Sequence, residues 1–204
     1  MTGFILAGGK SSRMNEDKGL KQLAGKPIVQ YVIDALKPCV EEVIIISNNF
    51  AYHQFGCKVV ADLVSDAGPL GGILTGLSNS VTDFNFFISC DMPFINSEAI
   101  GYLAKLVNGN KIIVPTVRGE IQPLFGIYPL SCLASVKTSI QENKLKLISF
   151  VEEYHHVLVP MEESGLNMNS LFTNINTQED FTTAARFFNN EDDTTNSSFA
   201  PMAN

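Results

Sequence analysis

Short, unbroken apolar runs alternate with amphipathic segments along most of this chain. The run at residues 43–46 carries no polar residue on either face, as is typical of strands that are covered on both sides. Strands are predicted at residues 2–7, 42–47, 58–61, 85–89, 111–116, 123–128, 156–160 and 172–175. Helices are predicted at residues 27–36, 71–80, 97–107, 130–142, 146–153 and 177–188.

Local residues mark where two of these helices begin. Pro27 suits a first helical position, because its missing N–H would have no partner there. Ile28 and Val32 then recur at the spacing that places them on one helical face. In the last helix, Thr177 with Asp180 three residues later forms a variant of the capping box.

The alternation of strands and helices predicts an α/β fold. We expect one domain, residues 1–188, with a Rossmann-like, mainly parallel sheet and helices on both faces. Residues 189–204 are acidic, polar and poor in apolar anchors, so a disordered tail is predicted there. No internal repeat or second domain is evident in the sequence.

Four notable positions follow four successive predicted strands. They are Gly8, Asn48, Asp62 and Asp91. Ligands of parallel α/β sheets bind outside the carboxyl ends of the strands. These four residues are therefore predicted to share one edge of the sheet.

The composition narrows the class of function. Of 204 residues 45% are hydrophobic and 17% charged, and the net charge of −7 comes without a long basic run, which argues against general nucleic-acid binding. The four cysteines are far apart and lack zinc-type spacing. No apolar run reaches about 18 residues. We expect no membrane span and a location in the cytoplasm.

The segment at residues 5–20 carries the strongest chemical signal. An apolar strand runs into Gly8 and Gly9, and Lys10, Arg13 and Lys18 follow within ten positions. Glycines let a backbone approach a polyphosphate closely, and the cations offset its charge. The Walker and dinucleotide patterns are absent. The alternative is a glycine turn after an edge strand with scattered basic residues.

Asp91 is the candidate metal ligand. It closes a predicted strand, and Pro93 prevents that strand from continuing. The alternative is a turn former or helix cap. Mg²⁺ prefers one or two carboxylates together with phosphate oxygens, which suits Asp91 once the glycine loop is considered.

The four glycines within residues 67–76 allow two interpretations. Close approach of a flat ligand such as a base is one, and a tightly packed helix entry is the other. The pair His155-His156 predicts no site, because neighbouring residues on a strand face opposite ways. No arrangement typical of a covalent nucleophile is evident.

Several of these segments resemble the molybdenum cofactor guanylyltransferases, a family of nucleotidyltransferases of the nucleotide-diphospho-sugar transferase type. The loop at residues 5–20 is similar to the family's L-A-G-G-x-S-x-R-M-G-x-D-K-G, with Asn15 where glycine is usual. Asn tolerates a left-handed backbone best among the other residues. Residues 67–76 resemble G-P-L-x-G-I, and residues 89–94 resemble C-D-x-P-F.

Two later segments extend the resemblance. Residues 118–128 are similar to Q-P-L-x-x-x-Y of the acceptor side, and residues 174–180 to N-x-N-T-P-E-D, with Gln178 in place of Pro. On a strand, Asn174 and Asn176 would share a face. The resemblance thus runs from residue 2 to about residue 188.

The resemblance implies a set of site residues. The implied catalytic residues are Arg13, Lys18 and Asp91, with Asp91 holding Mg²⁺. The implied nucleotide contacts are Leu6, Ala7, Gly8, Gly9, Ser11, Lys18, Asp62 and Asp91. The implied residues of the acceptor side are Gln122, Asn174 and Asn176.

The implied activity is transfer of GMP from GTP to the terminal phosphate of molybdenum-molybdopterin, with release of pyrophosphate. Transient contact with molybdenum-cofactor proteins is also implied. One alternative is another nucleotidyltransferase of the same fold, acting on molybdopterin with CTP or on a sugar phosphate. The opening Leu-Ala-Gly-Gly favours guanine over the Ala-Ala-Gly of cytidylyl relatives. The other alternative is a non-catalytic module that binds GTP or molybdopterin.

Overall fold

The structure of the chain, a computed structural model, describes residues 1–8, 17–168 and 170–196. Its centre is an eight-stranded sheet with the strand order β10-β7-β9-β6-β1-β4-β5, and β8 pairs with β7. The strands are β1 (Thr2–Leu6), β4 (Glu42–Ile46), β5 (Lys58–Val60), β6 (Phe84–Ser89), β7 (Ile112–Val117), β8 (Glu120–Ile121), β9 (Phe125–Pro129) and β10 (His156–Pro160). β1 is parallel to both β4 and β6, so the predicted mainly parallel sheet is confirmed.

β9 is the antiparallel strand in the middle of this sheet. It pairs antiparallel with β6 on one side and with β7 on the other. The chain reaches β9 through the β7–β8 hairpin, whose turn residues Arg118 and Gly119 have φ values of 51° and 80°. Gln122 follows this hairpin, and its segment is thereby brought next to β6.

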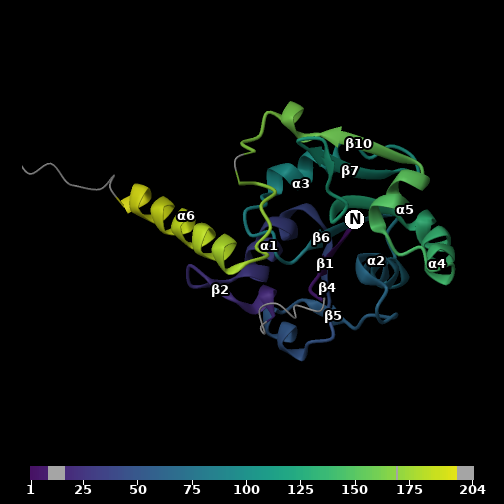
Figure 1. The fold of residues 1–204 in the computed structure, drawn as a ribbon, viewed down its shortest axis with the longest axis horizontal. Coiled ribbons are helices and arrows are strands. Elements are labelled where there is room, and N and C mark those ends of the chain that lie inside the picture. Colours follow the sequence, from purple (N-terminus) through teal and green to yellow (C-terminus); the bar gives the residue numbers. More distant parts are fainter. Residues whose placement is uncertain (9–16, 169, 197–204) are drawn as a thin grey trace, which may run out of the picture.

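Helices cover both faces of the sheet, as predicted (Figure 1). They are α1 (Ile28–Leu36), α2 (Gly68–Ser78), α3 (Ser97–Ala104), α4 (Leu133–Gln141), α5 (Leu147–Glu153) and α6 (Gln178–Asn196). α1 and α3 pack on one face in a cluster that includes Ile5 and Ile45. α2, α4 and α5 pack on the other face with Phe4 and Ile44. Side chains of successive strand residues therefore enter opposite cores, which explains the unbroken apolar runs.

Two short elements frame the carboxyl end of the sheet. The 3₁₀ helix η1 (Lys18–Leu20) follows the N-terminal loop, and η3 (Phe50–Phe55) follows β4. A small hairpin of β2 (Gln22–Leu23) and β3 (Lys26–Pro27) connects η1 to α1. This hairpin escapes prediction because two residues per strand are too few for a hydrophobic period. The other 3₁₀ helices are η2 (Lys37–Cys39), η4 (Leu130–Cys132) and η5 (Met161–Ser164).

The strand predicted at residues 172–175 is wrong. The segment forms no ladder, and Ile175 N–H donates instead to the carbonyl oxygen of Asp91, 2.9 Å away, beyond the end of β6. The apolar pattern that suggested a strand arises because Ile175 is buried under α6, against Leu23 and Ile28. Burial of one face therefore does not require a sheet partner here.

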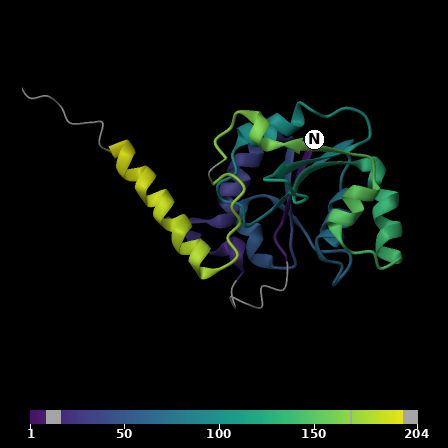
Figure 2. The ribbon, with the colours of Figure 1, turned by 45° about the horizontal axis from the view of Figure 1, so that its top comes forward.

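α6 extends beyond the predicted helix. It continues to Asn196, so residues 189–196, predicted as part of a disordered tail, have a helical backbone, and residues 197–204 lie outside the described part. Figure 2 shows the helix leaving the body of the molecule. Its packed part includes Phe181, Ala184 and Phe188, next to the loop residue Phe94.

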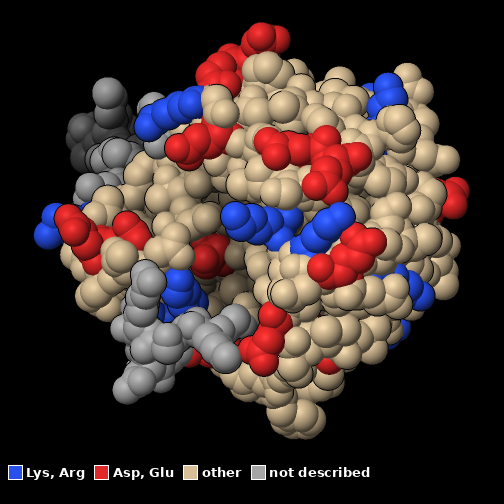
Figure 3. Space-filling view, turned by 45° about the vertical axis from the view of Figure 1, so that its right-hand side comes forward, with Lys and Arg blue, Asp and Glu red and all other residues tan. Residues whose placement is uncertain are grey.

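The surface and the cysteines agree with the composition. Charged side chains of both signs are interspersed over the face shown in Figure 3. All four cysteines are free thiols, and burial raises the pKa of Cys132 to about 12, so this thiol stays protonated. No helix within the described ranges has the length and apolarity needed to cross a bilayer.

Candidate functional site

The ends of the parallel strands meet at one edge of the sheet, as predicted. Cys90 N–H donates to the Leu6 carbonyl oxygen at 3.1 Å, and Ala7 N–H donates to the Ile46 carbonyl oxygen at 3.0 Å. The ladder thus continues one residue past the ends of β1 and β6. The residues that follow these strands, Gly8 and Asp91, are therefore held on the same side of the molecule.

Gly8, Asn48 and Asp62 come together at this edge. Asp62 N–H donates to Asn48 Oδ1 at 3.1 Å. A Cβ atom placed on Gly8 would lie 3.4 Å from Asp62 Oδ2, so this carboxylate lies beside the exposed backbone of Gly8. Burial raises the pKa of Asp62, and a hydrogen bond from the Thr75 hydroxyl partly opposes that shift.

Leu6 and Ala7 are not placed to contact a ligand through their side chains. Both side chains are buried in the cores on the two faces of the sheet. Any ligand contact by these two residues would therefore use their backbone. Their assignment to the nucleotide remains a prediction.

Asp91 occupies the loop directly after β6. Its Oδ1 accepts a hydrogen bond of 2.6 Å from the Ser89 hydroxyl. Its backbone carbonyl accepts from Ile175 N–H. Within the described ranges no other hydrogen bond to the carboxylate is found, so one oxygen keeps its capacity to accept. Asp91 is thus fixed through its backbone and oriented through one side-chain contact.

Lys18 lies where the N-terminal loop rejoins the fold. Its Nζ donates to Asn176 Oδ1 at 2.9 Å, which connects residues 158 positions apart in the sequence. Lys18 is half-buried in η1. The predicted loop residues Gly9, Ser11 and Arg13 lie outside the described residues.

The C-terminal segment brings two asparagines to the site. The predicted cap is confirmed, because Asp180 N–H donates to Thr177 Oγ1 at 3.1 Å and Thr177 N–H to Asp180 Oδ2 at 2.8 Å. Asn176 reaches Lys18, whereas Asn174 Oδ1 is buried with no hydrogen-bond partner in the described structure. A buried oxygen without a donor is costly, so a bound group that donates to it would be stabilising.

Gln122 lies near the end of β6 through its neighbours. Leu124, two residues on, accepts a hydrogen bond of 3.1 Å from Ser89 N–H. Gln122 N–H itself donates to Pro115 at 2.9 Å. Its side chain is half-buried at the carboxyl end of the sheet. The structure therefore brings Gln122 to the Asp91 side of the sheet, and its assignment to the acceptor side stays a prediction.

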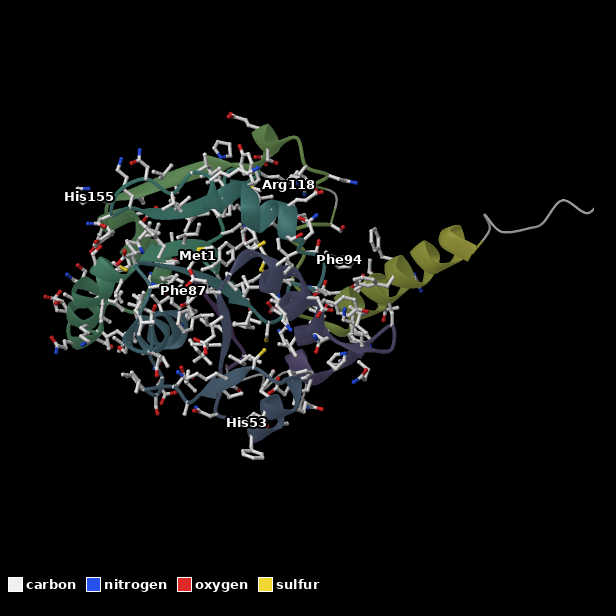
Figure 4. The ribbon with its side chains drawn as sticks, turned by 180° about the vertical axis from the view of Figure 1, so that it is seen from behind. Met1, His53, Phe87, Phe94, Arg118 and His155 are labelled. Atoms are coloured by element: carbon white, nitrogen blue, oxygen red, sulfur yellow. The ribbon has the colours of Figure 1, made fainter. Side chains whose placement is uncertain are left out.

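His53 lies in η3, apart from the adjacent pair His155-His156. Figure 4 shows His53 at the lower edge of the molecule and His155 at its upper left. His156 Nδ1 lies 2.9 Å from the Tyr154 carbonyl oxygen. Within the described residues, no group of three or more His, Cys, Asp or Glu side chains could hold a metal ion. Among the described side chains, Asp91 is therefore not part of a preformed cage of three or more such ligands.

Tyr52 and Asn49 are contacts that sequence reasoning misses. Both bond to the carboxylate of Asp17, the residue before Lys18. Both residues follow β4 in the sequence. That position, just after a parallel strand, is the signal that could have placed them at the carboxyl edge. Nothing in their spacing from Asp17 identifies the contact.

The sequence profile of the MobA-like NTP transferase domain matches residues 3–157. The chain belongs to this family. Gly8, Lys18, Asp62, Asp91 and Gln122 fall inside the matched range.

Two curated relatives cover most of the chain. A protein of Flavobacterium johnsoniae named probable molybdenum cofactor guanylyltransferase is 38% identical over 88% of this chain and 94% of its own length. A Vibrio cholerae protein named molybdenum cofactor guanylyltransferase is 36% identical over 86% of this chain and 87% of its own. Asn174 and Asn176 lie beyond the family profile.

Solved structures show the same fold. Molybdopterin-guanine dinucleotide biosynthesis protein A of Archaeoglobus fulgidus superposes with a TM-score of 0.79 at 21% identity, covering 93% of this chain and all of the other. The 2-C-methyl-D-erythritol 4-phosphate cytidylyltransferase of Thermus thermophilus has a TM-score of 0.68 at 10% identity, with coverages of 91% and 98%. The predicted fold, of the kind found in nucleotidyltransferases, is confirmed.

Proposed function

We propose that this protein transfers GMP from GTP to the terminal phosphate of molybdenum-molybdopterin, releasing pyrophosphate. Membership of the NTP transferase family and the names of the relatives support guanylyl transfer. The observation that carries the proposal is the position of Asp91. Its carboxylate is oriented by Ser89 at the carboxyl edge where the glycine loop leaves β1.

The donor set at this edge fits Mg²⁺. This cation takes one or two carboxylates and completes its shell with water and substrate phosphate oxygens. Asp91 is such a carboxylate, and no Cys or His cluster competes for a softer metal within the described residues. Mg²⁺ held there would supply Lewis-acid stabilisation of the charge on phosphate oxygens.

The chemistry asks the protein to bind, align and offset charge. A terminal phosphate oxygen of the acceptor attacks the α-phosphorus of GTP, the bond to the bridging α–β oxygen breaks, and pyrophosphate leaves with that electron pair. The attacking group is already anionic, so no covalent protein nucleophile is required. Catalysis then comes from alignment and electrostatic stabilisation.

The described residues divide between the two substrates. The backbone of Gly8, with Leu6 and Ala7 before it, would contact GTP, and Asp62 would line the nucleotide pocket beside Gly8. The Lys18 ammonium would leave Asn176 for the phosphates and offset the charge of the departing pyrophosphate.

Gly9, Ser11 and Arg13, outside the described residues, remain predicted phosphate contacts. On the acceptor side, the buried Asn174 oxygen would accept a hydrogen bond from the pterin, and Gln122 and Asn176 would be the other acceptor contacts. Contacts with molybdenum-cofactor proteins would deliver the acceptor, and the reaction would take place in the cytoplasm.

Mass spectrometry of the product tests the proposal. Incubation with GTP, Mg²⁺ and molybdenum-molybdopterin is expected to yield the guanine dinucleotide cofactor and pyrophosphate, and CTP is expected to yield no product. A product formed with CTP and not with GTP would show a cytidylyl enzyme. GTP binding without pyrophosphate release would show a binding module.

Asp91→Asn tests the metal role within that assay. We expect Mg²⁺-dependent GMP transfer to fall by about 10²–10³-fold or more, by analogy with the loss of one charge-stabilising group. The matched control is Asp83→Asn, the same change at an exposed carboxylate just before β6 begins. It should retain the activity of the unsubstituted protein, whereas full turnover by Asp91→Asn would disprove the assignment.

A further inference from the structure

The carboxylate of Asp17 is held by three donors. Its Oδ1 accepts from the Tyr52 hydroxyl and from Gly19 N–H, the latter at 3.2 Å. Its Oδ2 accepts from Asn49 Nδ2 at 2.9 Å. Each donor is uncharged, and hydrogen bonds to a carboxylate are stronger than neutral ones. Asp17 therefore joins the end of the N-terminal loop firmly to the segment after β4.

The partner side of this contact is itself well fixed. Tyr52 belongs to η3 and is fully buried. Asn49 caps the same helix, since its Oδ1 accepts from Ala51 N–H at 3.0 Å. The pKa of Tyr52 is raised, mainly by burial, so its hydroxyl stays protonated and remains a donor.

Gly19 shows how closely the loop lies against this support. A Cβ atom on Gly19 would be 2.3 Å from Tyr52 Oη and 3.3 Å from Cys90 Sγ. Cys90 immediately precedes Asp91. The backbone after Lys18 therefore lies in close contact with both η3 and the loop that carries Asp91. Only glycine allows so close an approach.

Lys18 stands between the two anchored residues. Asp17 fixes the backbone before it and Gly19 the backbone after it, while its side chain extends to Asn176. We propose that Asp17 and Tyr52 are positioning residues that hold the Lys18 ammonium in register with Asp91 for nucleotidyl transfer. This inference rests on the proposed function, because that function assigns phosphate charge to Lys18.

The geometry argues against Asp17 as a second metal ligand. Both of its oxygens already accept hydrogen bonds, so a cation would compete with the buried Tyr52 hydroxyl and the Asn49 amide for the carboxylate. The two roles separate experimentally in Asp17→Asn. A positioning role lowers kcat and leaves the half-saturating Mg²⁺ concentration unchanged. A rise of that concentration by about tenfold or more, the effect of disturbing a metal shell, would overturn the proposal.

Tyr52→Phe removes one hydroxyl and keeps the buried ring. We expect kcat to fall about tenfold, as for one hydrogen bond to a charged group, with KM for GTP changed by less than about threefold. In a Lys18→Ala background the same change should lower kcat by less than about twofold, because both substitutions act through one ammonium. Equal losses in both backgrounds would show that Tyr52 acts elsewhere.

Hydrogen exchange reads the contact without any substrate. Tyr52→Phe should speed amide exchange at Gly19 and Leu20 by about tenfold, since the carboxylate that caps η1 is released. The matched control is Tyr128→Phe, which removes a fully buried hydroxyl that donates to Pro123 at 2.7 Å and should leave this exchange unchanged.

The two readouts separate the two hypotheses. Unchanged exchange at Gly19 in Tyr52→Phe would overturn the positioning role directly. A lack of product from the unsubstituted protein, with exchange responding as expected, would instead overturn the proposed function on which that role depends. Altered exchange with kcat unchanged would leave the function in place and disprove positioning.

Discussion

At the scale of single residues, Asp62 is a carboxylate whose burial disfavours its charged form. It is half-buried after β5, and burial raises its pKa while the Thr75 hydroxyl lowers it in part. A raised pKa means that the folded state binds this proton more tightly than the unfolded chain does. The contribution of Asp62 to stability is therefore greatest at low pH and declines as the pH rises through the folded pKa.

Asp62→Asn should consequently raise the free energy of unfolding at pH 7, because the amide carries no charge to desolvate. The gain should shrink as the pH falls towards 3.8, the usual pKa of an aspartate. There Asp62 becomes protonated in the unfolded chain as well as in the folded protein. Urea unfolding at the two pH values measures it.

The exposed control Asp83→Asn should change stability by less than about 0.5 kcal/mol. Asp62→Asn is also expected to lose GTP affinity, since stability is often sacrificed at binding sites. A lower stability of Asp62→Asn at pH 7 would contradict the desolvation argument.

At the scale of elements, the glycines of α2 serve packing. A Cβ on Gly72 would lie 2.6 Å from a Leu6 methyl, and one on Gly76 would lie 2.3 Å from the Phe87 ring. Phe87 stacks on Phe4 at 5.0 Å between ring centroids, so it has little room to move. For these two glycines, the tight helix–sheet interpretation of residues 67–76 is confirmed. α2 lies close to the sheet at Gly72 and Gly76 because these two residues have no side chain.

Gly76→Ala and Gly101→Ala form a matched pair within helices. In Gly76→Ala the methyl group collides with Phe87, and the overpacking should lower the free energy of unfolding by about 1–3 kcal/mol. In Gly101→Ala of α3 the new methyl meets nothing within 4 Å, so better helix propensity should raise it by about 0.5–1 kcal/mol. Equal effects of the two substitutions in urea unfolding would refute this account.

At the scale of the whole molecule, the described residues form three hydrophobic clusters that hold the fold. Two lie on the faces of the sheet. The third joins the start of α6 to α1 and the β2–β3 hairpin through Leu23, Ile28 and Ala184. The site lies where the β2–β3 hairpin and α6 come together, because Lys18 shortly precedes the hairpin, Asn176 shortly precedes α6, and the two side chains are hydrogen-bonded.

Truncation tests how much of α6 the fold needs. Removal of residues 189–204 should change the free energy of unfolding by less than about 0.5 kcal/mol, because this segment is polar and acidic and offers few apolar side chains to bury. Removal of residues 178–204 should destabilise by several kcal/mol, since Ile28 and Ile175 lose their cover at about 25 cal/mol per Å². Thermal and urea unfolding of both variants measure this, and a large loss in the shorter truncation would contradict it.

Much of this architecture could be predicted because its signals are local. Unbroken apolar runs define buried strands, and helical spacing defines the faces of α1. Residues that follow parallel strands share an edge whatever the details of packing, so Gly8, Asp62 and Asp91 could be placed together from their positions alone. The family resemblance then added a chemical meaning to that edge.

Contacts between distant residues depended on the tertiary structure. The strand predicted at residues 172–175 became a crossing segment, and β9 entered the sheet antiparallel. The bonds from Asp17 to Tyr52 and from Lys18 to Asn176 join residues 35 and 158 positions apart. Periodicity reports which face of an element is buried, but it does not say which element covers that face. That choice is made only when the whole chain packs, and here it decides how the lysine and the carboxylate are held.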